Sequence, residues 1–115
     1  MPHLTLEYSS NIEFKLNHQD LFAQLHRLLN EAGGIRIDNF KSRALMRENF
    51  LVGRGDIENA FVHLELRLLE GRSPEAKNEI GQGCLQLLKE FYAPSLANQA
   101  LQITVEIADI SKETY

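Results

Sequence analysis

Two runs of alternating apolar and polar residues, separated by a segment of helical spacing, constrain the fold of this chain most strongly. The runs cover residues 62–68 and 101–107, and each places leucine, isoleucine or valine at every other position. A period of two is typical of β-strands with one buried face. The segment between them opens with Ser73-Pro74-Glu75, which supplies a helix N-cap, a proline in the first turn and an acid near the positive end of the helix dipole. Its apolar stripe is Ala76, Ile80, Cys84, Leu87, Leu88 and Phe91, and Pro94 lies just past its predicted end.

The first half of the chain repeats this strand–helix–strand plan. Residues 3–8 alternate polar and apolar side chains, and Asn17 is a suitable N-cap for a helix that Gly33-Gly34 ends. A weaker pattern predicts a second strand over about residues 40–48. The glycines within residues 49–59 predict a turn or loop. Each half is therefore predicted to be a βαβ unit.

We predict an α/β protein, classed as α+β in some schemes, with a single domain over residues 1–115. Two similar βαβ halves, at about 1–50 and 59–110, form a four-stranded mixed sheet in which the strands of each half run parallel. Two helices cover one face of the sheet. The other face is predicted to carry polar side chains with one aromatic, namely His3, Thr5, Glu7, Phe61, His63, Glu65 and Arg67. Because parallel strands normally have both faces covered, we expect other subunits of a homo-oligomer to cover this one.

Charge and hydropathy exclude several classes of function. The net charge of -4 provides no overall attraction to nucleic acid or anionic lipid. No apolar run approaches the roughly 20 residues that span a bilayer, and the N-terminus lacks a charged-then-apolar signal segment. We therefore expect a cytoplasmic protein with no nucleic-acid partner and no membrane contact.

The cysteine and histidine residues do not indicate a metal site. The single cysteine, Cys84, excludes an internal disulfide and a multi-cysteine metal site, and its helical position favours a buried apolar residue over a reactive thiol. The spacing of the four histidines matches no common zinc pattern. His3 and His63 are expected to have a structural role on the polar sheet face. We predict neither a metal nor a cofactor.

Pro2 stands where loss of Met1 exposes a secondary amine. Initiator methionine is commonly removed before a small residue such as proline. The reference pKa of an α-amino group is about 8, and both burial and neighbouring cations lower it. A proline amine beside arginines is therefore a candidate general base near physiological pH. A Met-Pro start is common, however, and carries little weight by itself.

Several cations could provide the positive charge that such a base needs nearby. Arg72 lies between the end of a predicted strand and the start of a helix, where free backbone amides and the helix dipole favour anions. Its guanidinium also offers a bidentate fork for a carboxylate. Lys41, Arg43 and Arg47 share one face of the predicted second strand. Taken singly, Arg72 is most simply a solvated loop arginine. The ordinary interpretation of Lys41, Arg43 and Arg47 is a solvated strand face.

Short segments along the whole chain carry a family resemblance. They are Met1-Pro2-His3, Ser10-Asn11-Ile12, Ser42-Arg43, Ala60-Phe61-Val62-His63 and Gly71-Arg72-Ser73. In this order and spacing they resemble the tautomerase superfamily, and within it the 5-carboxymethyl-2-hydroxymuconate isomerase family. The stretch LLEGRSPEAK is also similar to the opening of 4-oxalocrotonate tautomerase, a smaller relative built from one βαβ unit. That similarity agrees with the internal repeat.

The resemblance implies a fold, an assembly and a reaction. It implies a tautomerase-like homotrimer with active sites at subunit boundaries, in which Pro2 moves a proton along a conjugated, carboxylated enol acid such as 5-carboxymethyl-2-hydroxymuconate from aromatic catabolism. By the same resemblance, Arg72 binds or polarises the substrate. The family carries Arg-Ser-Arg on its second strand, which here is Lys41-Ser42-Arg43. Lysine keeps the charge and loses the planar fork, so Lys41 and Arg43 are both candidate substrate-binding residues.

Two other functions remain open. One is another activity of the superfamily, such as a phenylpyruvate-type tautomerase or a hydratase-like dehalogenase, although the latter needs an acid that the sequence does not identify. The other is a trimeric protein that keeps the fold, has weak catalysis and binds a partner, which the lysine at position 41 favours. Every enzymatic interpretation requires removal of Met1, because an amide nitrogen at Pro2 is not a base.

Overall fold

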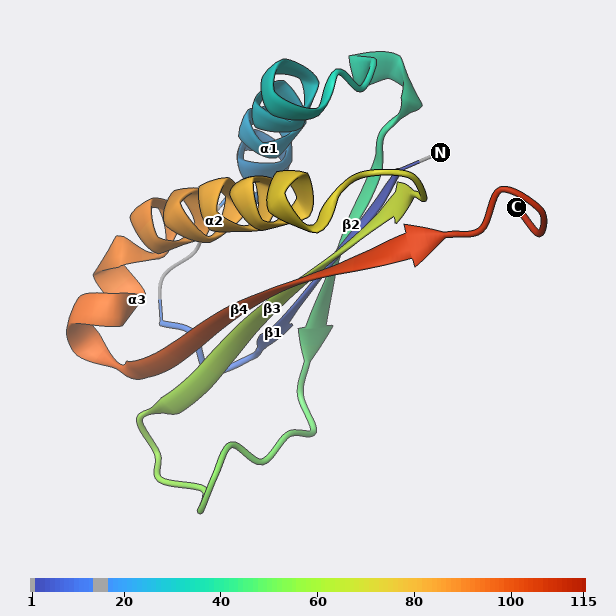
Figure 1. Cartoon of the computed structure of the whole chain (residues 1–115). Helices are drawn as coiled ribbons and strands as arrows, with labels where there is room; N and C mark the ends of the chain where they lie inside the picture. The colour runs from blue at the N-terminus through green and yellow to red at the C-terminus, as the bar shows by residue number, and fades with distance from the viewer. Residues whose placement is uncertain (1, 14–16) are drawn as a thin grey trace.

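The computed structural model describes residues 2–13 and 17–115, which form one four-stranded sheet covered by helices. The strands are β1 (His3–Ser9), β2 (Lys41–Arg47), β3 (Asn59–Leu69) and β4 (Ala100–Ile110). The helices are α1 (His18–Gly33), α2 (Pro74–Phe91) and α3 (Ala93–Asn98), and a 3₁₀ turn, η1 (Ile37–Asn39), precedes β2. The helices α1 and α2 lie on one side of the sheet, and α3 lies beyond the end of α2 (Figure 1).

The order of the strands is β2-β1-β3-β4, so the first strands of the two halves are neighbours in the centre. β1 pairs with β2 and β3 pairs with β4 in parallel, whereas β1 and β3 are antiparallel. The predicted mixed sheet with two helices on one face is thereby confirmed. In the central pair His3 lies opposite Arg67 and Tyr8 lies opposite Val62.

The predicted helix ends follow from local capping. The Asn17 side chain accepts a hydrogen bond from the backbone N–H of Asp20, and Gly34 adopts the left-handed conformation at φ 66° where α1 ends. The Ser73 hydroxyl accepts from the Ala76 N–H at 3.1 Å at the start of α2. These contacts confirm the caps expected from the sequence.

Pro94 lies just past the end of α2, as predicted, and a short helix that was not predicted begins there. Pro94 occupies the first turn of α3, which begins directly after Tyr92. Proline is well suited to this position, because the first N–H groups of a helix have no intrahelical partner. The proline therefore ends α2 and opens a second short helix.

The core lies between the sheet and the paired helices. Its fully buried side chains come from β1, β3, α1 and α2 and include Leu4, Leu6, Leu21, Leu25, Leu29, Val62, Leu64, Leu66, Cys84, Leu88 and Tyr92. Burial raises the pKa of the Cys84 thiol to about 12, so this thiol stays protonated. Cys84 is thus the buried apolar residue that its helical position predicted.

The face of the sheet opposite the helices carries polar contacts between strands. His63 Nδ1 lies 2.7 Å from Thr104 Oγ1, and its Nε2 lies 3.2 Å from Glu106 Oε1. The Arg47 guanidinium donates to Glu7 at 2.9 Å. His63 therefore has the structural role that was expected.

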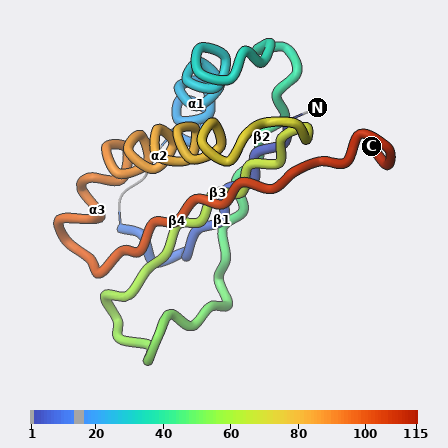
Figure 2. The backbone as a smooth tube through the Cα atoms, in the orientation of Figure 1, coloured from blue at the N-terminus to red at the C-terminus, as the bar shows by residue number. Residues whose placement is uncertain are grey.

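The connection between β2 and β3 extends away from the sheet and the helices (Figure 2). Its apolar side chains are unusually accessible, since Leu51 is 78% exposed and Ile57 is 93% exposed. No helix in the described part of the chain is both long enough and apolar enough to cross a membrane.

His18 joins the start of α1 to the core. Its ring stacks on Tyr8, with centroids 4.8 Å apart, and its Nε2 lies 3.0 Å from the buried Tyr92 hydroxyl. Burial lowers the pKa of His18 below the ordinary histidine value. The neutral ring is therefore the form that the fold favours.

We predict that His18 contributes a loss of stability in acid. As the pH falls below about 6.5, the unfolded chain binds a proton that folded His18 resists, so the free energy of unfolding decreases until the pH reaches the lowered folded-state pKa. Urea denaturation at about pH 7.5 and about pH 5.5, at one protein concentration, measures this difference. The difference should be smaller for His18→Gln than for the unsubstituted protein, and an equal difference would contradict this role.

Candidate active site

A cavity of about 430 Å³ lies at the end of the sheet where β1 begins and β3 ends. Both ends of the chain lie at this end of the molecule (Figure 1). The lining residues come from four segments and are Pro2, Gly34, Ile35, Arg36, Asn39, Leu68, Leu69, Glu70, Gly71, Arg72 and Lys112. Pro2 and Arg72, two of the residues singled out from the sequence, therefore share one cavity.

Pro2 is buried and directly precedes β1. Its carbonyl oxygen accepts a hydrogen bond from the Lys41 N–H at 3.2 Å, which extends the pairing of β1 with β2 by one residue. Because His3 pairs with Arg67 across β3, the next position outward places Pro2 beside Leu68. Met1, whose removal every enzymatic interpretation requires, lies outside the described residues.

Arg72 lies between the end of β3 and the start of α2 and is fixed by backbone carbonyls. Its Nη1 donates to the Leu69 oxygen and its Nη2 donates to the Gly33 oxygen, both at 3.2 Å. A guanidinium has five N–H donors, so three remain for a ligand. Within the described part of the chain, no carboxylate forms an ion pair with Arg72. The side chain is thus oriented and retains its charge for an anion.

Lys41 and Arg43 lie outside this cavity. Lys41 pairs with His3 in register, and its ammonium donates to the Asn39 carbonyl oxygen at 3.0 Å. The Arg43 guanidinium donates to His3 Nδ1 at 2.8 Å and to the Thr5 hydroxyl at 3.2 Å. The structure therefore brings Pro2 and Arg72 together and leaves these two cations on the open sheet face.

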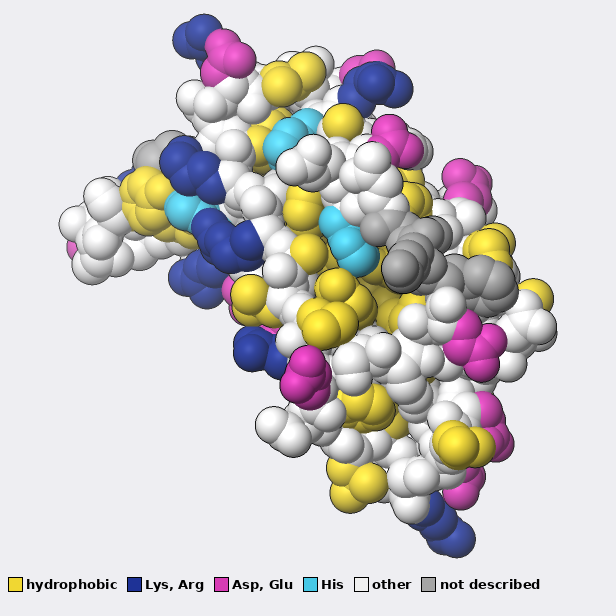
Figure 3. All heavy atoms as spheres, turned by 180° about the vertical axis from the view of Figure 1, so that it is seen from behind, with side chains coloured by type: hydrophobic (Ala, Val, Ile, Leu, Met, Phe, Trp, Pro, Cys, Tyr) yellow, Lys and Arg dark blue, Asp and Glu magenta, His cyan; other side chains and the backbone are white. Residues whose placement is uncertain are grey.

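His3 adds a polar contact beside the cavity. Since Arg43 donates to Nδ1, a neutral His3 carries its proton on Nε2, which donates to the Tyr115 hydroxyl at 2.7 Å. Burial, followed by the charges of Arg43 and Lys41, lowers the pKa of His3. His3 thus connects the basic strand β2 with the segment after β4, the structural role expected for it. Seen from behind, Lys and Arg side chains gather at this end of the molecule beside a histidine (Figure 3).

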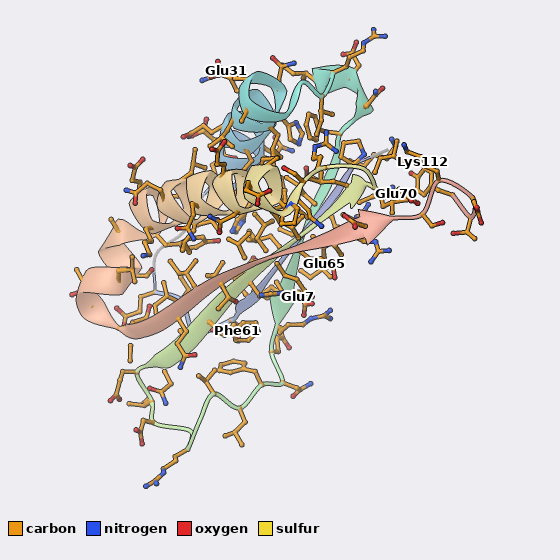
Figure 4. All side chains as sticks on the ribbon, in the orientation of Figure 1. Glu7, Glu31, Phe61, Glu65, Glu70 and Lys112 are labelled. Carbon is orange, nitrogen blue, oxygen red and sulfur yellow. The ribbon has the colours of Figure 1, made fainter. Side chains whose placement is uncertain are left out.

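Three charged cavity residues were not anticipated from the sequence. Arg36 follows the glycine pair that ends α1, Glu70 follows β3, and Lys112 follows β4. Figure 4 shows Glu70 and Lys112 close together at this end of the sheet. Their segments carry no periodic pattern, and the only available signal was that each lies within three residues of the end of a helix or strand.

The cavity combines a buried residue at the start of the chain with Arg36, Arg72 and Lys112. Such a set can bind a carboxylated compound and can stabilise negative charge that develops during a reaction. Among the described residues, no three His, Cys, Asp or Glu side chains are grouped in a way that could hold a metal ion. An anion bound in this cavity would lie beside Pro2.

Solved structures with the same fold include a 5-carboxymethyl-2-hydroxymuconate isomerase and a fused 4-OT protein. A 5-carboxymethyl-2-hydroxymuconate isomerase from Deinococcus radiodurans R1 superposes with a TM-score of 0.89 at 29% identity, covering 99% of this chain and 86% of its own. A fused 4-OT protein, described as a symmetric trimer, superposes with a TM-score of 0.71 at 14% identity, covering 98% and 91% of the two chains. The second likeness concerns the fold alone.

Sequence comparison gives the same family. The 5-carboxymethyl-2-hydroxymuconate Delta-isomerase of Escherichia coli is 27% identical over 110 residues, which are 96% of this chain and 87% of that protein. The family model for 5-carboxymethyl-2-hydroxymuconate isomerase matches residues 2–115, so the match begins at Pro2. The chain therefore belongs to the 5-carboxymethyl-2-hydroxymuconate isomerase family.

Proposed function

We propose that this protein is an enol–keto tautomerase in which Pro2, freed by removal of Met1, is the general base. The observation that carries the proposal is the shared cavity, in which a buried Pro2 lies with three cationic side chains. Burial and nearby positive charge both disfavour a protonated amine, so the free Pro2 amine would be largely neutral near physiological pH. The proposed substrate is 5-carboxymethyl-2-hydroxymuconate, after which the E. coli relative is named.

The proposed reaction is a proton transfer without cofactor or net redox change. The Pro2 nitrogen takes the proton of the enol hydroxyl, and the C=O double bond forms as electron density moves along the conjugated chain. A proton then returns from the Pro2 ammonium to a carbon of that chain. One O–H bond breaks and one C–H bond forms, so atoms and charge balance and Pro2 regains its neutral form.

Arg72 is the proposed electrostatic partner of Pro2. Its free N–H donors would bind a substrate carboxylate and stabilise the negative charge that develops on the conjugated acid. Lys41 and Arg43 are proposed to assist substrate binding with charge from the neighbouring face of β1 and β2. In a trimer with active sites at subunit boundaries, this face would belong to the surroundings of a site.

A homotrimer is part of the proposal and is supported by the uncovered surfaces. The two parallel strand pairs carry helices on one face, and parallel sheets are normally covered on both. Leu51 and Ile57 also expose large apolar side chains in the connection before β3, as interface residues do. A structural relative in the fused 4-OT group is described as a symmetric trimer.

The first prediction concerns removal of Met1. Protein shown by intact mass to lack Met1 should isomerise 5-carboxymethyl-2-hydroxymuconate in an ultraviolet assay. A Met1-retaining preparation should be slower by about 10²–10⁴-fold in kcat, because its Pro2 nitrogen is an amide. Equal turnover by a preparation that wholly retains Met1 would falsify the role of Pro2.

The second prediction concerns Arg72. Arg72→Ala should lower kcat/KM by about 10²–10³-fold, the usual loss for one donor that stabilises developing charge, and Arg72→Lys should recover part of that loss. Arg27→Ala, on the exposed side of α1 and outside the cavity lining, is a matched control that should keep full activity. Near-normal kcat/KM in a folded Arg72→Ala protein would contradict the assignment.

The third prediction concerns assembly. Sedimentation equilibrium should give about three times the chain mass of 13.1 kDa, because the open sheet face requires a partner. A stable monomer at micromolar concentration would rule out the trimer while leaving the role of Pro2 to be judged by the first prediction.

A further inference from the structure

The segment after β4, residues 111–115, forms part of the cavity wall and is held at two points. The Lys112 backbone N–H donates to Glu70 Oε2 at 2.7 Å. The Tyr115 hydroxyl accepts from His3 Nε2 at 2.7 Å. Glu70 directly follows β3 and His3 opens β1, so both contacts tie the segment to the central strands.

The Lys112 ammonium is directed at the loop that carries Arg72. Its Nζ lies 3.7 Å from where a Cβ atom would stand on Gly71. Gly71 has a backbone φ of +120°, which residues other than glycine rarely adopt. Among the described residues, this ammonium forms no ion pair and no hydrogen bond. Its charge is therefore available to a ligand.

The cavity carries more positively charged side chains than are needed to bind a single carboxylate. Arg36, Arg72 and Lys112 reach it from three separate segments. Glu70 is the one carboxylate residue in the described lining, and it is engaged by the Lys112 backbone. Arg36 lies 4.0 Å from Asp38 with both side chains at least 80% exposed, an ion pair of little strength. Separated cations of this kind fit an anion with several separated carboxylates.

We propose that Lys112 is a specificity-determining residue that binds a substrate carboxylate remote from the enol, so that the cavity selects enol acids with more than one carboxylate. This inference rests on the proposed tautomerase function of the same site. Glu70 is its positioning residue, because its carboxylate accepts from the Lys112 N–H and so holds the ammonium beside the loop that carries Arg72.

The test compares a multiply carboxylated and a singly carboxylated enol acid. Lys112→Gln should raise KM for 5-carboxymethyl-2-hydroxymuconate by about tenfold with kcat unchanged, the size expected for one charge-assisted contact. For phenylenolpyruvate, which has one carboxylate, KM should change less than about twofold. Lys89→Gln, near the far end of α2, removes the same charge away from the cavity and should alter neither value.

Glu70 is tested by a pair of substitutions. Glu70→Ala should raise KM for the multiply carboxylated substrate, because the Lys112 N–H loses its acceptor. Glu70→Gln keeps an acceptor oxygen, so its KM should be equal to or below that of the unsubstituted protein. A KM raised equally by both substitutions would overturn the positioning role.

The outcomes separate this inference from the proposed function. Equal changes of KM for the two enol acids, or none for the multiply carboxylated one, would overturn the role of Lys112. If the Met1-free protein converts neither acid, the proposed function fails, and calorimetric titration with tricarballylate then tests Lys112 alone. About tenfold weaker binding by Lys112→Gln than by Lys89→Gln would support the carboxylate contact, and equal binding would overturn it.

Discussion

The antiparallel pairing of β1 with β3 is the contact on which the other features of this protein depend. It joins the two βαβ halves through their first strands, and its register sets His3 opposite Arg67. One residue further out, Pro2 meets Leu68 and the loop that leads to Arg72. Because side chains alternate along a strand, a shift of one residue would turn the buried Leu4 and Leu6 toward the open face. The hydrophobic core therefore enforces the register that assembles the cavity.

Arg72 connects the end of β3 to the end of α1. By donating to the carbonyls of Gly33 and Leu69, it ties the end of α1 in one half to the end of β3 in the other. The same two bonds orient the guanidinium and leave donors for a ligand. Cations from the ends of several elements thus meet at one end of the sheet, which explains how an acidic chain of net charge -4 can carry a site for anions.

Most elements of the fold could be predicted from the sequence, because local patterns determine them. The Ser73 and Asn17 caps and the alternation in β3 and β4 each act over a few residues. The helix α3 was missed because proline ends one helix and opens another with the same chemistry.

The candidate site was less accessible to sequence reasoning. Arg36 and Lys112 reach the cavity only through tertiary packing, so no local pattern identifies them. The shared face of Lys41 and Arg43 could be predicted from the strand period. That this face lies outside the cavity could be seen only from the strand register.

The central claim is that Pro2 acts as a free amine of lowered basicity, and ¹⁵N NMR of proline-labelled, Met1-free protein tests it most directly. Of the three prolines, only Pro2 would then carry a titrating amine, since the others are amides. The account predicts that its pKa lies below the ordinary α-amino value of about 8, and a pKa at or above that value would contradict it.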